Sequence, residues 1–202
     1  MLERYMSRNC FRCLVAGLLI LASSSVGCSS SSSDISPAGI AASFTASPTA
    51  AGANGVRLAA TSSGDMVTIQ VMIGAPTSSS DLYSFAFDLV LGDETVAEYV
   101  GGSATAGTAL TTSGGQSLQV LASQQGDRVA MGVTKLGGGA GNAVTGTGEV
   151  LVAEFTFRLL KAGTTSLSIE GAPGNDPAAL DSGGSDIASV TFDDADATLI
   201  GL

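Results

Sequence analysis

Strict alternation of apolar and polar side chains is the feature that most constrains the fold of this chain. Between residues 67 and 73 every second side chain is a Val or Ile, and residues 83–91 and 151–159 repeat the pattern with Phe and Leu. Such alternation places one face of a strand against a core and the other against solvent. No ten-residue stretch has the 3.6-residue period of an amphipathic helix. The chain is therefore predicted to be all-β, an antiparallel two-sheet β-sandwich.

Shorter stretches repeat this pattern and bring the expected number of strands to about eight or nine. They are centred on Leu118/Val120, Val129/Met131/Val133, Leu167/Ile169 and Val190/Phe192. Turn-forming pairs separate the stretches: Gly64-Asp65, Gly92-Asp93, Gly126-Asp127 and Ala162-Gly163. Six of the seven Phe residues lie in or at the edge of this region, so their rings are expected to fill the core.

Two counts exclude whole classes of function. The chain has no His, which removes Ser-His-Asp and Cys-His catalysis and also His-ligated zinc or haem. Its formal net charge of −10 argues against nucleic acid, which is bound through Lys and Arg. Adjacent carboxylates such as Asp93 and Glu94 point apart on a strand or turn, so no glycosidase pair is recognised. We predict no catalytic residue, no enzymatic activity and no nucleic-acid partner.

Residues 1–28 are typical of a bacterial export signal. Basic residues precede Leu14–Ala22, an apolar stretch about half as long as the ~20 residues that span a bilayer. Residues 25–28 (Ser-Val-Gly-Cys) resemble the lipobox of bacterial lipoproteins, with Ser25 where that family usually has Leu. The resemblance implies a signal peptide at 1–27 and lipidation of Cys28, for example with palmitate. The alternative is an ordinary signal peptide, cut nearby, that leaves one spare thiol.

The lipoprotein resemblance also has consequences for location and for the other cysteines. Ser29 follows the cysteine where Asp would imply retention at the inner membrane, so the outer membrane or cell surface is expected. Cys10 and Cys13 lie in the segment to be removed, which leaves no internal disulfide. Residues 28–53 are rich in Ser, Ala and Pro and are expected to be a flexible tether. Residues 54–202 have the length of one domain.

Four segments, in this order, resemble strands of the cohesin-like domain, a β-sandwich related to carbohydrate-binding modules. They are residues 64–71 (GDMVTIQV), 82–89 (LYSFAFDL), 148–157 (GEVLVAEFTF) and 163–167 (GTTSL). One turn departs from the family pattern, because residues 90–93 lack the proline that usually follows the second strand. The resemblance covers about residues 54–200 and implies jelly-roll topology.

The same resemblance implies one of two activities. One is docking of a dockerin-type protein partner, and the other is polysaccharide binding linked to polysaccharide breakdown. The chain has no Trp, which argues against a flat aromatic platform for sugar rings. Tyr83, at the head of an apolar face, is expected in the core. The alternative is a structural protein of the cell envelope or matrix without a discrete ligand.

The acidic residues near the C-terminal end are the best candidates for a metal site. Asp186, Asp193, Asp194 and Asp196 together offer the carboxylate oxygens that Ca²⁺ prefers. Their spacing matches no EF-hand loop, and the alternative is that they are solvated surface charges. A second acidic loop, residues 175–181, would contribute if the two approach each other. No other cofactor is predicted, and the glycine-rich residues 137–141 are expected to be a hairpin loop rather than a phosphate-binding loop.

Overall fold

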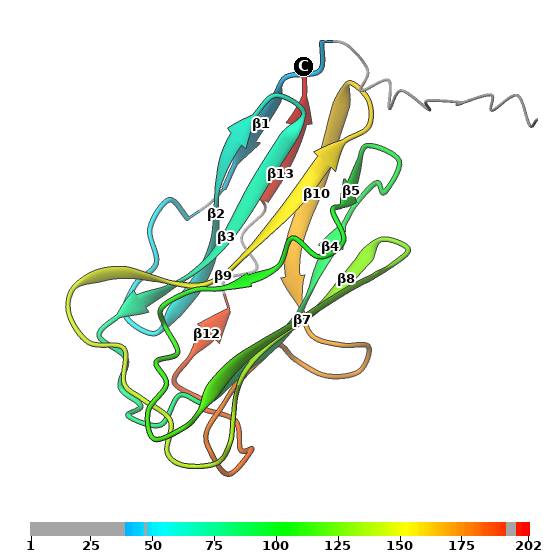
Figure 1. The fold of residues 1–202 in the computed structure, drawn as a ribbon. Coiled ribbons are helices and arrows are strands. Elements are labelled where there is room, and N and C mark those ends of the chain that lie inside the picture. Colours follow the sequence, from blue (N-terminus) through cyan, green and yellow to red (C-terminus); the bar gives the residue numbers. More distant parts are fainter. Residues whose placement is uncertain (1–38, 47, 193–196) are drawn as a thin grey trace, which may run out of the picture. The chain divides into compact units, whose positions relative to one another are not determined.

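The computed structural model describes residues 39–46, 48–192 and 197–202 (Figure 1). These residues form thirteen strands and no helix. It follows that none of the described segments has the long apolar helix that a membrane span needs. The predicted signal peptide, Cys28 and residues 28–38 and 47 of the predicted tether lie outside the described residues, so the signal peptide and the lipidation of Cys28 remain predictions.

Seven strands form sheet A, in the order β1-β13-β10-β4-β8-β7, with β11 also paired to β4. Every pairing in this sheet is antiparallel. Its strands are β1 (Ala42–Thr45), β4 (Ser84–Leu91), β7 (Ser117–Gln125), β8 (Arg128–Leu136), β10 (Gly163–Glu170), β11 (Ala178–Leu180) and β13 (Ala197–Gly201).

Six strands form sheet B, in the order β12-β2-β3-β9-β5, with β6 also paired to β9. Its strands are β2 (Gly55–Ser63), β3 (Met66–Ala75), β5 (Ala97–Tyr99), β6 (Thr105–Ala106), β9 (Gly148–Leu159) and β12 (Thr191–Phe192). The pairing of β12 with β2 is parallel, unlike the others. Consecutive strands β8, β9 and β10 alternate between the sheets, as in a jelly roll. The predicted two-sheet β-sandwich is confirmed.

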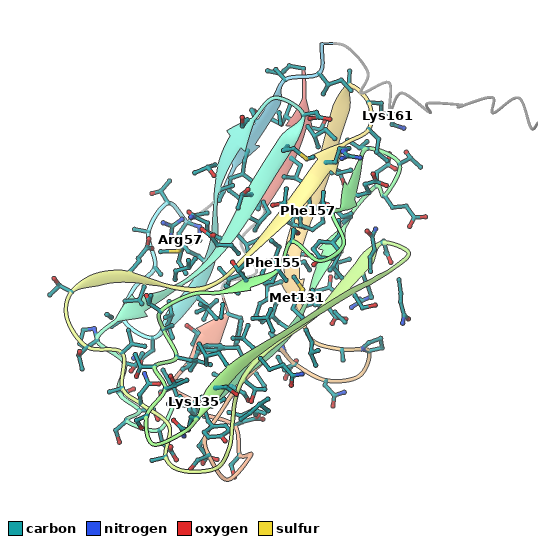
Figure 2. The ribbon with its side chains drawn as sticks, viewed as in Figure 1. Arg57, Met131, Lys135, Phe155, Phe157 and Lys161 are labelled. Atoms are coloured by element: carbon teal, nitrogen blue, oxygen red, sulfur yellow. The ribbon has the colours of Figure 1, made fainter. Side chains whose placement is uncertain are left out.

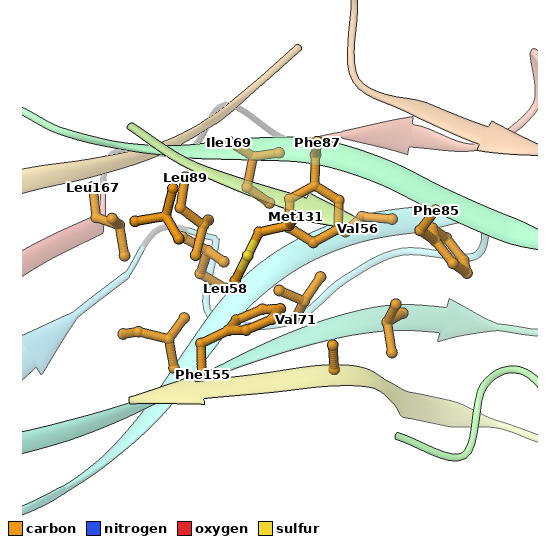
Figure 3. Packing of buried hydrophobic residues seen from close by; sticks show 14 of the residues in the cluster. Val56, Leu58, Val71, Phe85, Phe87, Leu89, Met131, Phe155, Leu167 and Ile169 are labelled. Atoms are coloured by element: carbon orange, nitrogen blue, oxygen red, sulfur yellow. The ribbon is translucent and has the colours of Figure 1, made fainter. Parts of the chain in front are cut away.

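The core lies between the two sheets and is built from the alternating apolar positions (Figure 3). Phe87 of β4 and Phe155 of β9 meet edge to face, with ring centroids 6.3 Å apart. Phe85 and Phe157 are also buried. Edge-to-face rings add to the free energy gained by burial alone. These four rings fill the core, as the sequence predicts, and Phe44 and Phe192 are partly buried against it.

Two predicted Gly-Asp turns connect neighbouring strands of one sheet. Gly64 joins β2 to β3 with φ of 61°, and Gly126 joins β7 to β8 with φ of 62°. A positive φ at the first of two turn residues suits the right-handed twist of a hairpin, and Gly adopts it without steric cost. In contrast, the glycine-rich residues 137–141 lead from β8 in sheet A to β9 in sheet B. They form a crossover between sheets, not the predicted hairpin loop.

The folded part begins earlier than the predicted boundary at residue 54. β1 lies within the predicted tether and pairs with β13, so that Ala42 is opposite Gly201. Ala41 and Leu202 also exchange two backbone hydrogen bonds of 3.2 and 3.0 Å. Ile40 and Phe44 pack against the core. Apolar residues at every second position over so short a stretch are sufficient for an edge strand, because the neighbouring strand supplies the rest of the contact surface.

Candidate docking face

The face of sheet A that points away from the core is formed mainly by β4, β8 and β7, and we call it the outer face. Its side chains alternate with core side chains along each strand, which is the consequence of the two-residue period. It comprises Ser84, Ala86, Asp88 and Val90 of β4, Arg128, Ala130, Gly132, Thr134 and Leu136 of β8, and Ser117, Gln119, Leu121, Ser123 and Gln125 of β7.

The centre of the outer face is made of small side chains. Gly132 lies between Ala86 of β4 and Leu121 of β7 in the strand register, and Ala130 is in the next row. A Cβ added at Gly132 would meet no heavy atom within 4 Å, so nothing covers this position. The result is a shallow surface on which a partner's main chain or side chains would find no bulky obstacle.

Two large apolar side chains stand on this face. Leu121 is 59% exposed and Leu136 is 42% exposed. Within the described residues only Leu160 and Leu202 are other large apolar side chains with comparable exposure. Isolated exposed leucines are ordinary, and these two lie on the weakly charged part of one sheet face, Leu121 opposite Gly132 and Leu136 opposite Ser117.

The charged groups of the outer face are gathered at one end and satisfy one another. Arg128 contacts Asp88 at 3.2 Å and Glu170 of β10 at 2.5 Å, and it also donates to the carbonyl of Gly171. Hydrogen bonds to Glu170 and then Asp88 raise the pKa of Arg128 above its already high ordinary value. This guanidinium therefore carries a fixed charge, which joins β8 to β10 across β4 and leaves the rest of the face without ionised side chains.

Two hollows lie beside the charged end of the outer face. A cavity of about 890 Å³ is bounded by Arg128, Glu170 and Phe192 together with the loop after β10, residues 171–177. A second, of about 490 Å³, lies between Ala86 and Ala130 of the sheet and Asp176 and Asp186 of the loops. The loop after β10 thus borders both hollows and limits how far a flat partner could extend in this direction.

The predicted metal residues are not brought together within the described part of the chain. Asp186 borders the smaller hollow, whereas Asp193, Asp194 and Asp196 lie outside the described residues. In the second acidic loop, Asp181 accepts hydrogen bonds from the backbone of Gly183 and Ser185, both at 2.9 Å, and so closes its own turn. No group of three or more carboxylates or thiolates among the described residues is arranged to hold a metal. The calcium site therefore remains a prediction.

The structure also places two residues that sequence reasoning did not single out. Lys135 of β8 is only 2% exposed and lies near the end of the sandwich (Figure 2). Burial lowers the pKa of its ammonium group, and the charge of Asp81 opposes this effect. The carboxylate of Asp81 accepts hydrogen bonds from the Ser182 hydroxyl and the Gly141 backbone, which lower its pKa. The two-residue period of β8 could have predicted the burial of Lys135, because this residue continues the inward-facing positions of Met131 and Val133.

The two tyrosines in the described part of the chain, Tyr83 and Tyr99, do not provide an aromatic surface for sugar rings. Tyr99 is 8% exposed and packs edge to face on Phe157, with centroids 6.1 Å apart. Tyr83 precedes β4, where its carbonyl accepts the backbone N–H of Lys135, and it is half-buried rather than part of the core cluster. The prediction of Tyr83 as a core residue is therefore wrong, because the strand's buried run starts two residues later at Phe85.

No protein-family model and no curated protein matches this chain. Solved structures to which it is similar are cohesin modules. One is the cohesin module of a family 33 glycoside hydrolase from Clostridium perfringens, at 11% identity and a TM-score of 0.45, with 80% of this chain and 96% of that one covered.

Two further structures are of the same kind. The second type II cohesin module of the adaptor ScaA scaffoldin of Acetivibrio cellulolyticus is 13% identical, with a TM-score of 0.46 and coverage of 76% and 86%. A non-cellulosomal cohesin from the hyperthermophilic archaeon Archaeoglobus fulgidus is 13% identical, with a TM-score of 0.43 and coverage of 75% and 86%. The two sheets establish the all-β sandwich on their own, and the chain is similar in fold to these cohesin modules.

Proposed function

We propose that this chain is a non-catalytic docking module whose outer face binds a protein partner of the dockerin kind. The observation that carries the proposal is the exposure of Leu121 and Leu136 on a flat face whose centre is Ala86 and Gly132. Exposed apolar side chains gain free energy when a partner covers them, and small neighbours leave room for the partner to approach closely. The four cohesin-like segments of the sequence support the choice of partner class.

The outer face supplies part of the contact area that this role needs. Three strands about 4.8 Å apart and eight or nine residues long cover roughly 10 by 30 Å. A stable interface buries about 800 Å² on each partner, so the partner would also contact neighbouring loops or β10. The few charges of the face are paired with one another, which reduces the cost of removing water from it.

The test is to block the outer face without disturbing the fold. Gly132→Arg places a long charged side chain at its centre, where a Cβ meets open space. Gly101→Arg is a matched control, because its Cβ also meets open space, in the turn after β5. Binding is measured by titration against a panel of dockerin-type modules and secreted proteins of the source organism. We expect at least a tenfold loss of affinity for Gly132→Arg only. An unchanged affinity for Gly132→Arg would rule out the outer face as the site.

Polysaccharide binding is a second candidate, favoured by the cavity of about 890 Å³. Arg128, Glu170, Asn175 and Asp176 border it and offer hydrogen bonds suited to sugar hydroxyls, and Phe192 offers an apolar wall. The Asn175→Ala variant would then lose binding on a polysaccharide array, whereas Gly132→Arg would keep it. The opposite pattern would favour protein docking.

We also propose that Cys28 is lipidated and holds the domain at the outer membrane or cell surface. The short apolar stretch and the lipobox-like residues 25–28 support this location. The Cys28→Ser variant is expected to leave the membrane fraction and collect in the soluble fraction. A variant that remains with the membrane would contradict the anchor. A protein that is anchored but binds neither partner class would instead have the structural role in the envelope or matrix.

A further inference from the structure

β7 is an open edge of sheet A. It pairs only with β8 and is nine residues long, whereas the edge strands β1, β12 and β5 have four, two and three residues. It has no Pro, no charged side chain and no register shift along its pairing with β8. Edge strands of natural sheets ordinarily carry one of these features, because each prevents the addition of another strand. β7 therefore lacks the usual protection.

The direction in which each residue of β8 makes its backbone hydrogen bonds shows which backbone groups of β7 face the open side. Lys135 donates its backbone N–H to Tyr83, on the β4 side of β8. Residues alternate in an antiparallel ladder, so the odd-numbered residues of β8 bond toward β4 and the even-numbered ones toward β7. Leu121, opposite Gly132, is therefore bonded to β8. The even-numbered residues of β7 direct their backbone N–H and C=O groups outward, and no described residue bonds to these backbone groups. They are Leu118, Val120, Ala122 and Gln124, and the Gln124 side chain accepts the backbone N–H of Tyr99 at 2.8 Å.

The charge distribution favours a second copy of the chain as the occupant. From Tyr99 to Gly126 there is no charged side chain, although the whole chain has 18 acidic and 8 basic residues. Two acidic molecules that meet along β7 bring neutral surfaces together and keep their carboxylates apart. A partner of opposite charge would gain nothing from this edge. The uncharged strip is thus the part of the surface where self-repulsion is smallest.

The exposed side chains then select one register. If a twofold axis passes through Leu121, Val120 bonds with Ala122 of the second copy and Leu118 with Gln124, which uses all the outward backbone groups. Leu121 then faces its own counterpart at a non-hydrogen-bonded position, where Cα atoms are about 4.5 Å apart and side chains lie closest. This pairing covers Leu121, which is 59% exposed, on the outer face. On the inner side it covers Val120 and Ala122, which are only partly buried.

We propose that two copies of this chain pair through β7, antiparallel and with Leu121 on the twofold axis, so that their two sheets A become one continuous sheet. The contact shares Leu121 with the proposed docking face, but it is tested by cross-linking and dissociation rather than by partner affinity. It would place two outer faces side by side and facing the same way. A partner with two binding segments would then be held by both copies.

The decisive experiment is site-specific cross-linking of the full chain in the producing cells. Cys10, Cys13 and Cys28 are replaced by Ser, and one new cysteine is introduced by Leu121→Cys. At a non-hydrogen-bonded pair the Cα separation suits a disulfide. We expect mild oxidation to convert most of the protein to a disulfide-linked dimer on a non-reducing gel. Leu136→Cys is the matched control, since this leucine is also exposed on the outer face but belongs to β8, four residues from the axis in register.

Mixed cysteines test the register itself. Gln119 would face Ser123 of the second copy, so Gln119→Cys and Ser123→Cys should cross-link when co-expressed and at least fivefold less when either is expressed alone. Equal cross-linking of Leu121→Cys and Leu136→Cys would overturn the proposal. So would capture of a different protein by Leu121→Cys, because the edge would then take a foreign strand.

A second measurement does not depend on cysteine chemistry. Ala122→Pro removes one outward N–H and none that bonds to β8, and proline is tolerated on such an edge. For the full chain in detergent, sedimentation should show a dimer that dissociates at least tenfold more readily in the Ala122→Pro variant, with unchanged circular dichroism. A wild-type chain that is monomeric at 0.1 mM would also overturn the proposal, as would a dimer indifferent to Ala122→Pro while the fold is kept.

Discussion

The two outer faces of this sandwich differ in how their side chains are satisfied. On sheet B, residues opposite each other on β3 and β9 pair: Gln70 donates to Glu154 at 2.7 Å, and the hydroxyls of Thr68 and Thr156 are 3.3 Å apart. On sheet A, the corresponding central positions hold Ala86, Gly132 and Leu121, which offer one another no polar contact. On sheet B the polar side chains satisfy one another while exposed to water, whereas on sheet A burial of Leu121 by a partner would be favourable in free energy.

This difference shows that burial pattern alone does not identify a binding surface. Both faces alternate with core residues in the same way, and both are solvent-exposed sheets. The two faces differ in the side chains that lie opposite one another on adjacent strands. On sheet B these are polar groups that hydrogen-bond to each other, and on sheet A they are small or apolar.

The largest effect is expected from matched glycine substitutions on the two sheets. Gly74 of β3 lies against Gly52, and a Cβ there would be 1.8 Å from the Gly52 carbonyl oxygen. Gly74→Ala should therefore lower the free energy of unfolding by about 2–4 kcal/mol, because the backbone must move. Gly132→Ala should change it by less than about 1 kcal/mol, in the stabilising direction. Urea denaturation measures both. Equal losses would mean that the outer face of sheet A is packed as closely as sheet B.

The ion pair that joins β2 to β9 across β3 of sheet B gives the next effect, and it depends on pH. Arg57 of β2 contacts Glu149 of β9, with side chains only 11% and 18% exposed. The hydrogen bond from Arg57 holds the pKa of Glu149 below its ordinary value. A lowered pKa contributes stability that is present above about pH 4.3 and is lost as the pH falls through the folded-state pKa. Glu149→Gln should cost about 1–3 kcal/mol at pH 7.

The pH dependence of the unfolding free energy distinguishes the ionised Glu149 carboxylate from a general sensitivity of the protein to acid. The difference in unfolding free energy between wild type and Glu149→Gln should shrink as the pH falls below about 4.3. Glu170→Gln on sheet A is the control, because that carboxylate is 44% exposed and should give a smaller difference at pH 7. A pH-independent gap for Glu149→Gln would exclude the ionised carboxylate as its source.

A smaller effect is expected from the polar pair of sheet B. Gln70→Ala removes the donor to Glu154, which should cost about 0.5–1.5 kcal/mol. Partner binding should be unchanged, because the substitution lies on the face opposite the proposed site. Thermal unfolding and the binding titration are made on the same preparation. A loss of binding with Gln70→Ala would transfer the docking function to sheet B.

The smallest effect on stability is expected from Leu136→Ser on the outer face. The side chain is 42% exposed, so its removal should change the unfolding free energy by no more than about 0.5 kcal/mol. Affinity for the protein partner should nevertheless fall several-fold. A large loss of stability would mean that this leucine belongs to the core rather than to a contact surface.

Most of the long strands were predicted because their alternation is local, but the nine-residue β2 was missed, since after Leu58 it reads Ala-Ala-Thr-Ser-Ser and shows no apolar alternation. β3, β4 and β9 lie where residues 67–73, 83–91 and 151–159 alternate. β1 was missed because four residues at an edge show too little pattern. β13 was also missed, since its role depends on β1 and β10 on either side.

The candidate site was harder to predict, for a physical reason. Leu121 and Gly132 become neighbours through strand register, and Arg128 meets Glu170 only because β10 and β8 both pair with β4. Arg57 and Glu149 are 92 residues apart in the chain. Pairs so far apart in the chain cannot be recognised from local sequence patterns. The acidic character of the chain, in contrast, follows from composition alone. The calcium residues remain a prediction, because three of them lie outside the described part.

The pairing of β1 with β13 has a practical consequence for engineering this domain. Since Ala41 and Leu202 exchange backbone hydrogen bonds, the folded part begins and ends at one place. A linker of a few residues would join these ends, and new ends could then be opened at an exposed turn such as Gly126-Asp127. The same geometry allows the whole sandwich to be inserted into a surface loop of another protein, as a cassette with a single point of attachment.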